Sequence, residues 1–335
     1  MNTLELNNYL TKIIKYKNYD SLMIWGAPGI GKSCIVKDIA NKNKLKFIDL
    51  RLGQLAPTDI RGLPVADHQK KISTWYPPEF LPLDGKGILF LDEINMAPPT
   101  LQGVAQQLIL DRKVGSYNLP NEWFIWAAGN RKQDKAAVYD MPSALKNRFL
   151  HCNIESDFEC FKRWAIKNFI DERIISFLGW RPELLHHIDH INSAWPSPRT
   201  WEMANNLFKN NVNIKCAVGE GASNEFYAWL KVYEKIPDLT KILNGTGGKL
   251  SFDKEPSTKY AIILGLALRS NTSEYLKNSI EWLSNKAEAE WIQMFIHALQ
   301  DSGHLNENKG ILAQSISKNK SLKKFISEYA KFIDS

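Results

Sequence analysis

Gly26-Ala27-Pro28-Gly29-Ile30-Gly31-Lys32-Ser33 is the stretch of sequence that decides the fold of this chain. It matches the pattern G-x-x-x-x-G-K-[ST], in which glycines let backbone N–H groups close around phosphate oxygens. The apolar run 22–25 before it predicts a buried strand, and residues 34–40 after it have helical spacing. Lys32 adds a positive charge to this cradle, and the Ser33 hydroxyl can ligate Mg²⁺. We therefore expect a nucleotide site at 26–33, extended by Cys34 at the start of the helix.

Composition places the chain among ordinary soluble globular proteins. Its 335 residues are enough for two or three domains, and the charged content of 24% is typical of such proteins. The sequence shows neither an apolar run of membrane-span length nor the profile of a signal peptide at its N-terminus. Its four cysteines show no C-x-x-C pairing, so neither a zinc site nor a disulfide framework is indicated. A reduced, cytoplasmic setting is the resulting expectation.

The net charge of +7 raises the question of nucleic-acid binding. The lysines are scattered among asparagines rather than gathered in one basic block, which is more typical of compositional bias. Direct nucleic-acid binding therefore stays open as the weaker hypothesis.

A second motif lies at Gly87-Ile88-Leu89-Phe90-Leu91-Asp92-Glu93. Four apolar residues predict a strand buried on both faces, as in a parallel sheet, and two carboxylates follow at its end. Asp92 can hold Mg²⁺ through water, and Glu93 can orient and deprotonate the water that attacks the γ-phosphate. Paired acids at a strand end are by themselves often only a helix N-cap. Together with the glycine-rich stretch they indicate nucleotide hydrolysis.

A third strand, predicted at 123–128, ends at Gly129-Asn130, at the same edge of the sheet as Asp92. An amide there can hydrogen-bond both the γ-phosphate and the attacking water. Further patterns predict the following elements: a helix within 1–20, a buried strand at 46–50, a turn-rich passage at 56–64, a hairpin at 65–75 with its turn at 67–70, a helix at 97–110, and a second hairpin at 111–120.

The order of these motifs resembles that of AAA+ ATPases of the MoxR type. The resemblance is carried by Gly26–Ser33, Leu91-Asp92-Glu93, Ala128-Gly129-Asn130, Asn147-Arg148-Phe149 and Ser197-Pro198-Arg199-Thr200, and it covers roughly residues 1–235. The passage 59–64 with the first hairpin resembles the insert that interrupts helix 2 in that group, and 111–120 resembles its pre-sensor hairpin.

The resemblance implies roles for three further residues. Asn130 matches the sensor-1 asparagine, and Arg148 matches the arginine finger that reaches the ATP of a neighbouring subunit. Arg199 matches the sensor-2 arginine at the start of a lid helix, 200–208. Without the resemblance, Arg148 would be read as a surface charge on a helix. Arg131 departs from the family pattern, and could be a second charge acting on a neighbour or a salt-bridge partner for Asp134.

The chain beyond residue 152 has helical patterns throughout. Helices are predicted at 158–168, 171–178, 182–192, 200–209, 223–233, 258–267, 282–299 and 322–333. His186 and His190 have the i,i+4 spacing of a metal pair, but with no third ligand in the pattern a solvated or packed face is favoured. A glycine-rich linker is predicted at 244–248. The expected organisation is an α/β P-loop core with β-hairpin inserts at 1–152, an α-helical lid at 153–240 and a helical extension at 250–335.

The resemblance implies an ATP-hydrolysing motor that uses ATP and Mg²⁺, assembles as a homo-oligomer, a hexameric ring, and remodels a protein client. The usual partner in that group is a protein with a von Willebrand factor A domain. Two alternatives remain. One is a nucleic-acid motor that grips DNA with the pre-sensor hairpin, for which Lys113 and Lys70-Lys71 would be the contacts. The other is a non-hydrolysing switch, which the intact Lys32, Asp92, Glu93 and Asn130 argue against.

Overall fold

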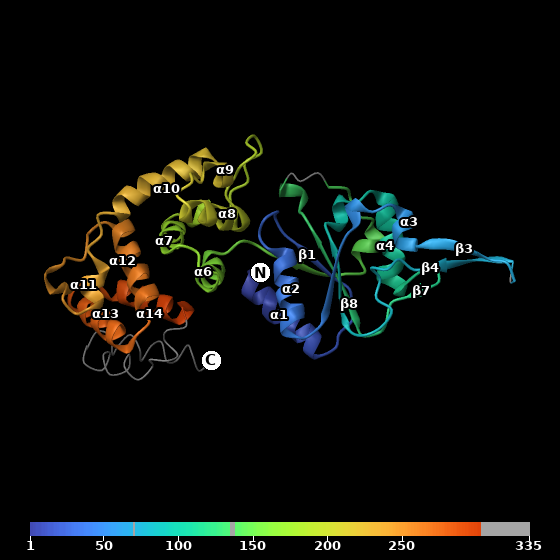
Figure 1. Ribbon diagram of the computed structural model, residues 1–335, viewed down its shortest axis with the longest axis horizontal. Coiled ribbons are helices and arrows are strands. Elements are labelled where there is room, and N and C mark those ends of the chain that lie inside the picture. Colours follow the sequence, from blue (N-terminus) through green and yellow to red (C-terminus); the bar gives the residue numbers. More distant parts are fainter. Residues whose placement is uncertain (70, 135–137, 303–335) are drawn as a thin grey trace. The chain divides into compact units, whose positions relative to one another are not determined.

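Two compact units make up the chain, unit 1 at Met1–Asp157 and unit 2 at Phe158–Ser335 (Figure 1). The computed structural model describes residues 1–69, 71–134 and 138–302. Lys70 in the turn of the first predicted hairpin, and the predicted helix at 322–333, lie outside the described residues. None of the described helices is long and apolar enough to cross a membrane.

Unit 1 is built on a parallel sheet of five strands in the order β2-β5-β8-β1-β9. The strands are β1 Leu22–Trp25, β2 Lys46–Arg51, β5 Gly87–Asp92, β8 Trp123–Gly129 and β9 Leu150–Asn153. Every residue of β5 and β8 is buried, since both strands lie inside the sheet. The predicted α/β P-loop core, followed by a helical C-terminal part, is therefore confirmed.

Strand β2 corrects one prediction. The pattern at 46–50 predicts a buried strand, but in the structure Leu50 is the one buried residue of β2. The reason is that β2 lies at the edge of the sheet and pairs with β5 alone. Apolar spacing indicates a strand here, but it does not show whether the strand is internal or at an edge.

Helices cover both faces of this sheet, with α1 and α2 on one face and α3 and α4 on the other (Figure 1). The helical elements of unit 1 are α1 Thr3–Lys15, α2 Lys32–Lys42, η1 Leu52–Gln54, α3 Pro57–Arg61, η2 Ile94–Met96, α4 Pro99–Asp111, η3 Lys132–Asp134 and α5 Ser143–Lys146. Helix α1 begins with a capping box, in which Asn2 and Glu5 exchange side-chain-to-backbone hydrogen bonds. Its buried face is Leu6, Leu10 and Ile13.

Both predicted hairpins are confirmed: β3 Leu63–Asp67 pairs with β4 Ile72–Tyr76, and β6 Lys113–Val114 pairs with β7 Tyr117–Asn118. The β3–β4 hairpin extends away from the sheet (Figure 1). At its base Gly62 has φ +86°, and a Cβ there would lie 1.9 Å from the Tyr76 carbonyl oxygen. The Ser116 hydroxyl donates to the Trp75 carbonyl (2.9 Å), so the turn of the second hairpin is hydrogen-bonded to the first.

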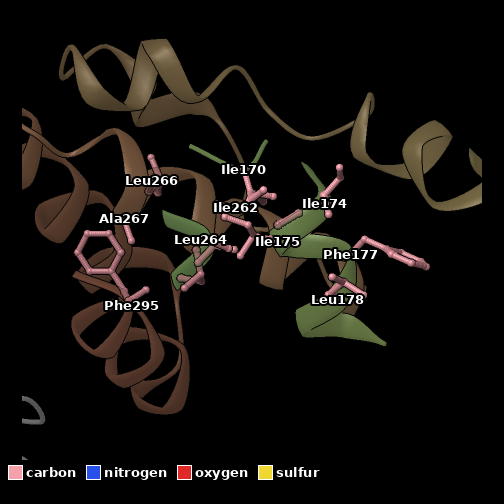
Figure 2. Packing of buried hydrophobic residues seen from close by; sticks show 14 of the residues in the cluster. Ile170, Ile174, Ile175, Phe177, Leu178, Ile262, Leu264, Leu266, Ala267 and Phe295 are labelled. Carbon is pink, nitrogen blue, oxygen red and sulfur yellow. The ribbon is translucent and has the colours of Figure 1, made fainter. Parts of the chain in front are cut away.

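Unit 2 is helical in its described part. Its elements are α6 Phe158–Lys167, α7 Glu172–Trp180, η4 Pro182–Leu185, α8 Pro198–Lys209, α9 Lys215–Val218, α10 Glu220–Tyr233, α11 Leu239–Leu243, η5 Gly247–Lys249, α12 Pro256–Arg269, α13 Ser273–Lys286 and α14 Ala289–Ser302. One apolar core joins them, and Figure 2 shows residues of α7, α12 and α14 within it.

Two helix predictions in unit 2 are wrong. Residues 182–192 form only the short η4, and the loop after it is held by a hydrogen bond from His187 N to the Pro196 carbonyl (3.0 Å). The i,i+4 spacing of His186 and His190 therefore does not place them on one helical face. The pattern at 282–299 is broken at Ala287, whose extended backbone separates α13 from α14. In residues 1–69, 71–134 and 138–302, no group of three or more His, Cys, Asp or Glu could hold a metal ion.

The predicted linker at 244–248 lies against α13. The Trp282 indole N–H donates to the Gly247 carbonyl (2.9 Å), and the Asn278 amide donates to the Leu243 carbonyl (2.7 Å). Helices on both sides of this stretch contribute to the same core, for example through Leu243 and Leu283. The separation of a lid at 153–240 from an extension at 250–335 stays a prediction.

Candidate nucleotide-binding and catalytic site

The glycine-rich stretch lies at the carboxyl end of β1, where it leads into α2. Gly26 N donates to the Gly129 carbonyl (3.3 Å), which joins the loop to the end of β8. Gly29 and Gly31 have φ of +81° and +91°, a region that side-chain-bearing residues rarely adopt. Gly31 is the N-cap of α2, so the loop ends at the positive end of a helix. Its backbone thus leads its N–H groups to a helix N-terminus, where an anion would be favoured.

At Gly26 the space around the residue, rather than its φ angle, favours glycine. A Cβ at this position would lie 2.5 Å from Ile30 Cδ1 and 2.8 Å from Ile154 Cγ1, closer than real contacts allow. The loop is therefore folded tightly over the sheet, against the chain that follows β9.

Lys32 is buried and its ammonium group lies inside the loop. It donates to the carbonyl oxygens of Gly26 (2.8 Å) and Ala27 (3.0 Å) and to Asn130 Oδ1 (2.9 Å). These contacts fix the charge at the mouth of the cradle and join it to the end of β8. Phosphate oxygens are acceptors of the same kind, and could take up part of this hydrogen bonding.

Ser33 and Asp92 meet at the same place. The Ser33 hydroxyl donates to Asp92 Oδ2, although 59 positions separate the two residues. The pKa of Asp49 on β2 is raised, first by burial and then by the negative charge of Asp92, with a smaller contribution from Glu93. The positive charges of Arg51 and Lys37 lower the pKa of Asp49 but do not cancel the increase. Asp49, Asp92 and Glu93 thus lie within electrostatic reach of one another. A hydroxyl and a carboxylate there form a donor set that Mg²⁺ fits, because this ion prefers oxygen ligands.

Glu93 follows Asp92 in the left-handed region, with φ +53° and ψ +35°. This conformation costs about 1 kcal/mol or more in a residue with a side chain. Its N–H donates to Asp92 Oδ1 (3.0 Å), and its carbonyl accepts from Met96 N (2.8 Å), which closes the turn η2. Glu93 is exposed, so its side chain is accessible to water.

Asn130 completes the cluster and is held by a residue that the sequence interpretation missed. Asn95, in η2, donates from Nδ2 to the Asn130 carbonyl (2.7 Å) and accepts at Oδ1 from Asn130 N (3.2 Å). Both asparagines are buried. The available signal was the asparagine two residues after Glu93, a polar residue in an otherwise apolar turn. The structure thus brings together Lys32, Ser33, Asp92 and Asn130, with Glu93 following Asp92 in the chain.

Arg148 lies at the opposite end of the sheet from this cluster. It is exposed and falls between α5 and β9, two residues before Leu150, whose N–H donates to the Ser21 carbonyl at the start of β1. The four residues of β1 span about 13 Å, and the cradle begins only after them. Arg148 also lines a cavity of about 460 Å³ with Asn147, Phe149 and other residues at this end.

Arg199 belongs to unit 2, where it is exposed at the second position of α8. Ser197 caps this helix: its hydroxyl accepts from Thr200 N (3.2 Å), and its own N–H donates to the Thr200 hydroxyl (2.7 Å). The capping explains why α8 begins here. The role of Arg199 toward a nucleotide stays a prediction.

Arg131 is engaged in a salt bridge. Its Nε and Nη2 donate to the two carboxylate oxygens of Asp134, each at 3.1 Å, and Nη1 lies 3.6 Å from Glu155 Oε1. Of the two hypotheses for this residue, the salt bridge with Asp134 is the one that the structure confirms.

Among solved structures, the chain is similar to a mutant of RuvB from Thermotoga maritima, with 15% identity, 87% of this chain and 85% of that chain covered and a TM-score of 0.39. NtrX from Brucella abortus in complex with ADP gives 13% identity, 96% and 68% coverage and a TM-score of 0.36. For a putative ATPase from Cytophaga hutchinsonii ATCC 33406 the identity is 14%, the covered shares are 87% of this chain and 78% of that chain, and the TM-score is 0.34. These likenesses are too weak to carry an argument about function.

The comparison with curated proteins gave no match. A family model does match, over residues 21–151, a segment that lies entirely within unit 1. The matched segment contains the glycine-rich loop, the Asp92-Glu93 turn and Asn130. The family described by that model is the ATPase family associated with various cellular activities (AAA).

Proposed function

We propose that this chain is an ATP-hydrolysing AAA+ motor that works as a ring. The observation that carries the proposal is the convergence of Lys32, Ser33, Asp92 and Asn130 at one edge of the sheet. The family match over 21–151 supports it independently.

Within one subunit, the loop backbone and Lys32 bind the β- and γ-phosphates of ATP. Ser33 and Asp92 would hold Mg²⁺, which when bound neutralises negative charge on the phosphates. Glu93 accepts a proton from the attacking water, and general-base help of this kind contributes about 10²–10⁴-fold in rate. The Asn130 amide orients that water against the γ-phosphate.

Arg148 acts on the nucleotide of a neighbouring subunit. Its position at the amino end of the sheet supports this, because the cradle of its own subunit lies at the carboxyl end. A guanidinium stays charged and can fork across phosphate oxygens, so it suits the stabilisation of charge in the transition state. In such a contact, one face of a subunit meets a different face of the next subunit, and repeating it can close a ring. The resemblance implies six copies.

The motion of the ring would be passed to a protein client through the two hairpins. Their mutual hydrogen bond, Ser116 to Trp75, and the extension of β3–β4 away from the sheet support this role. The resemblance to MoxR-type ATPases supports a chaperone-like remodelling activity, with a von Willebrand factor A domain protein as partner.

Phosphate release from ATP by the purified chain, with and without Mg²⁺, tests the proposal. We expect hydrolysis that depends on Mg²⁺ and is lost in Glu93→Gln. The absence of Mg²⁺-dependent hydrolysis in the wild-type chain would overturn the proposal, whereas an undiminished rate in Glu93→Gln would remove Glu93 from the mechanism. The matched control is Glu122→Gln, an exposed acid in the turn before β8, which should keep the wild-type rate.

A further inference from the structure

We propose that Asn95 is a positioning residue that couples the Glu93 turn to Asn130, and thereby sets the rate of hydrolysis. This inference rests on the proposed function, because Asn130 and Glu93 are the groups that it places. Neither the family pattern used above nor the site prediction included Asn95.

The backbone of Asn130 lies beyond the last residue pair between β5 and β8. The last residue pair between β5 and β8 is Leu91 with Ala127, while β1 continues to pair with β8 as far as Gly129. The Gly129 carbonyl accepts from Gly26 on the β1 side. In a strand, successive residues direct their N–H and C=O groups to alternate sides, so those of Asn130 point to the side of β5. The Asn95 carboxamide meets both groups there, in place of a neighbouring strand.

The fit around Asn95 is tight and specific to its side chain. A Cβ at Gly129 would lie 2.6 Å from Asn95 Oδ1 and 2.6 Å from Met23 Cε. Met23 Cε is the end of a flexible side chain that can shift, whereas the Asn95 carboxamide is held by its two hydrogen bonds, so a side chain at Gly129 is incompatible with this placement of the carboxamide. The main chain of Asn95 is fixed as well, since its carbonyl accepts from Tyr139 N (2.7 Å). With only 3% of its surface exposed, Asn95 cannot exchange these partners for water without opening the turn.

The same turn also fixes the backbone conformation of Glu93. The left-handed backbone of Glu93 starts η2, and η2 is what directs the Asn95 side chain toward β8. Asn130 in turn accepts from Lys32 at Oδ1. Asn95 therefore lies between the general base on one side and the water-orienting amide and the phosphate-binding lysine on the other. A small movement of Asn130 relative to Glu93 would misalign the attacking water, to which rates are very sensitive.

The test measures ATP affinity and turnover separately in Asn95→Ala and Asn95→Asp. Asn95→Asp keeps the shape and an acceptor for Asn130 N, but an ionised carboxylate cannot donate to the Asn130 carbonyl. We expect kcat to fall at least tenfold, about 1.4 kcal/mol in the barrier, in both variants. The Kd for ATP should stay within about threefold of wild type, because the loop and Lys32 remain in place.

Asn205→Ala is the matched control. Asn205 is also a buried asparagine whose side chain bonds a main-chain group, accepting from Asp171 N (2.8 Å), but it lies in unit 2. Its loss should lower the melting temperature and leave kcat unchanged. A purely structural role for Asn95 would give the same result as Asn205→Ala, which would overturn the inference.

A double-mutant cycle with Gly129→Ala measures the coupling of the two residues in kcat, which a loss of stability alone would not produce. Gly129→Ala should lower kcat by displacing Asn95, so the loss in the double variant Asn95→Ala, Gly129→Ala should be clearly smaller than the product of the two single losses. Independent, multiplicative losses would contradict the coupling. If wild type itself shows no turnover, the proposed function fails; if wild type turns over and both Asn95 variants match it, only this inference fails.

Discussion

At the scale of single residues, the proposed mechanism assigns binding of the nucleotide and reaction with it to different side chains. Lys32 is buried among three oxygen acceptors, two of them carbonyls of its own loop. Glu93 is exposed, and its main chain is held by hydrogen bonds to the Asp92 carboxylate and to Met96 N. Removing the first should therefore impair binding, and removing the charge of the second should impair chemistry.

We expect Lys32→Ala to abolish measurable ATP binding, and Glu93→Gln to bind ATP normally while hydrolysing it at least 100-fold more slowly. Calorimetric titration of ATP and a phosphate-release assay separate these outcomes. Lys42→Ala, exposed in the last turn of the same helix, is the control for loss of a lysine and should behave as wild type. Hydrolysis by Glu93→Gln at an undiminished rate would remove Glu93 from the mechanism.

At the scale of secondary-structure elements, the ion pair at the start of α7 predicts a pH dependence of stability. Asp171 caps α7 and accepts from Arg173 N (2.9 Å), Arg173 Nε (2.9 Å) and Arg173 Nη2 (2.7 Å). Burial by itself would raise the pKa of Asp171, but the hydrogen bonds and charge of Arg173 outweigh it and lower the pKa. A carboxyl with a lowered folded-state pKa stabilises the fold above its unfolded pKa of about 3.9, and this contribution is lost as the pH falls through the folded-state pKa.

Asp171→Asn keeps a capping oxygen and removes the charge. We expect it to lower the free energy of unfolding by about 1 kcal/mol at pH 7, because Arg173 is partly exposed to solvent. Urea unfolding at pH 7 and at pH 3 should show the difference from wild type shrinking at the lower pH. A difference that does not change with pH would show that the ion pair contributes nothing.

The β3–β4 hairpin is the element to which we assign contact with the client. Replacing residues 66–73 by Asn-Gly keeps the pair Val65–Thr74 and closes the hairpin with a two-residue turn. We expect ATP turnover to stay within about threefold of wild type, roughly 0.7 kcal/mol in the barrier, while remodelling of the bound partner is lost. Thermal stability, ATPase rate and partner pull-down are measured on the one variant. Early melting with loss of all activities would instead assign the hairpin a structural role. A variant that still remodels its partner would contradict the assignment of client contact to this hairpin.

The elements also show which parts of the fold and of the site can be predicted from the sequence alone. Strands β5 and β8 were predictable because continuous apolar runs between turns have few alternatives in a P-loop sheet. The break at Ala287 was not, since the apolar spacing continues from α13 into α14 while the backbone becomes extended. In the site, Lys32, Ser33 and Asp92 follow from their motifs. Asn95 did not, because its importance depends on where the turn after Glu93 directs its side chain.

At the scale of the whole molecule, the proposed role of Arg148 predicts that activity depends on assembly. If the site is completed by a neighbour, the ATPase rate per subunit should rise with protein concentration and reach a plateau as rings form. Light scattering with and without a non-hydrolysable ATP analogue reports the assembly in parallel. A rate per subunit that stays constant down to concentrations at which only monomers scatter would contradict this expectation.

The measurement that tests the central claim most directly is a mixing experiment with Arg148→Ala and Glu93→Gln. Each variant alone should be nearly inactive, since one lacks the finger and the other lacks the base. In mixed rings, an Arg148→Ala subunit keeps Glu93 and can receive Arg148 from a Glu93→Gln neighbour. At equal amounts, about a quarter of the interfaces have this arrangement, so the mixture should recover up to about a quarter of the wild-type rate. Lys146→Ala, an exposed cation two residues away, is the control for Arg148→Ala and should be active alone. A mixture that forms mixed rings but stays as inactive as its components would contradict the claim that Arg148 completes the site of a neighbouring subunit.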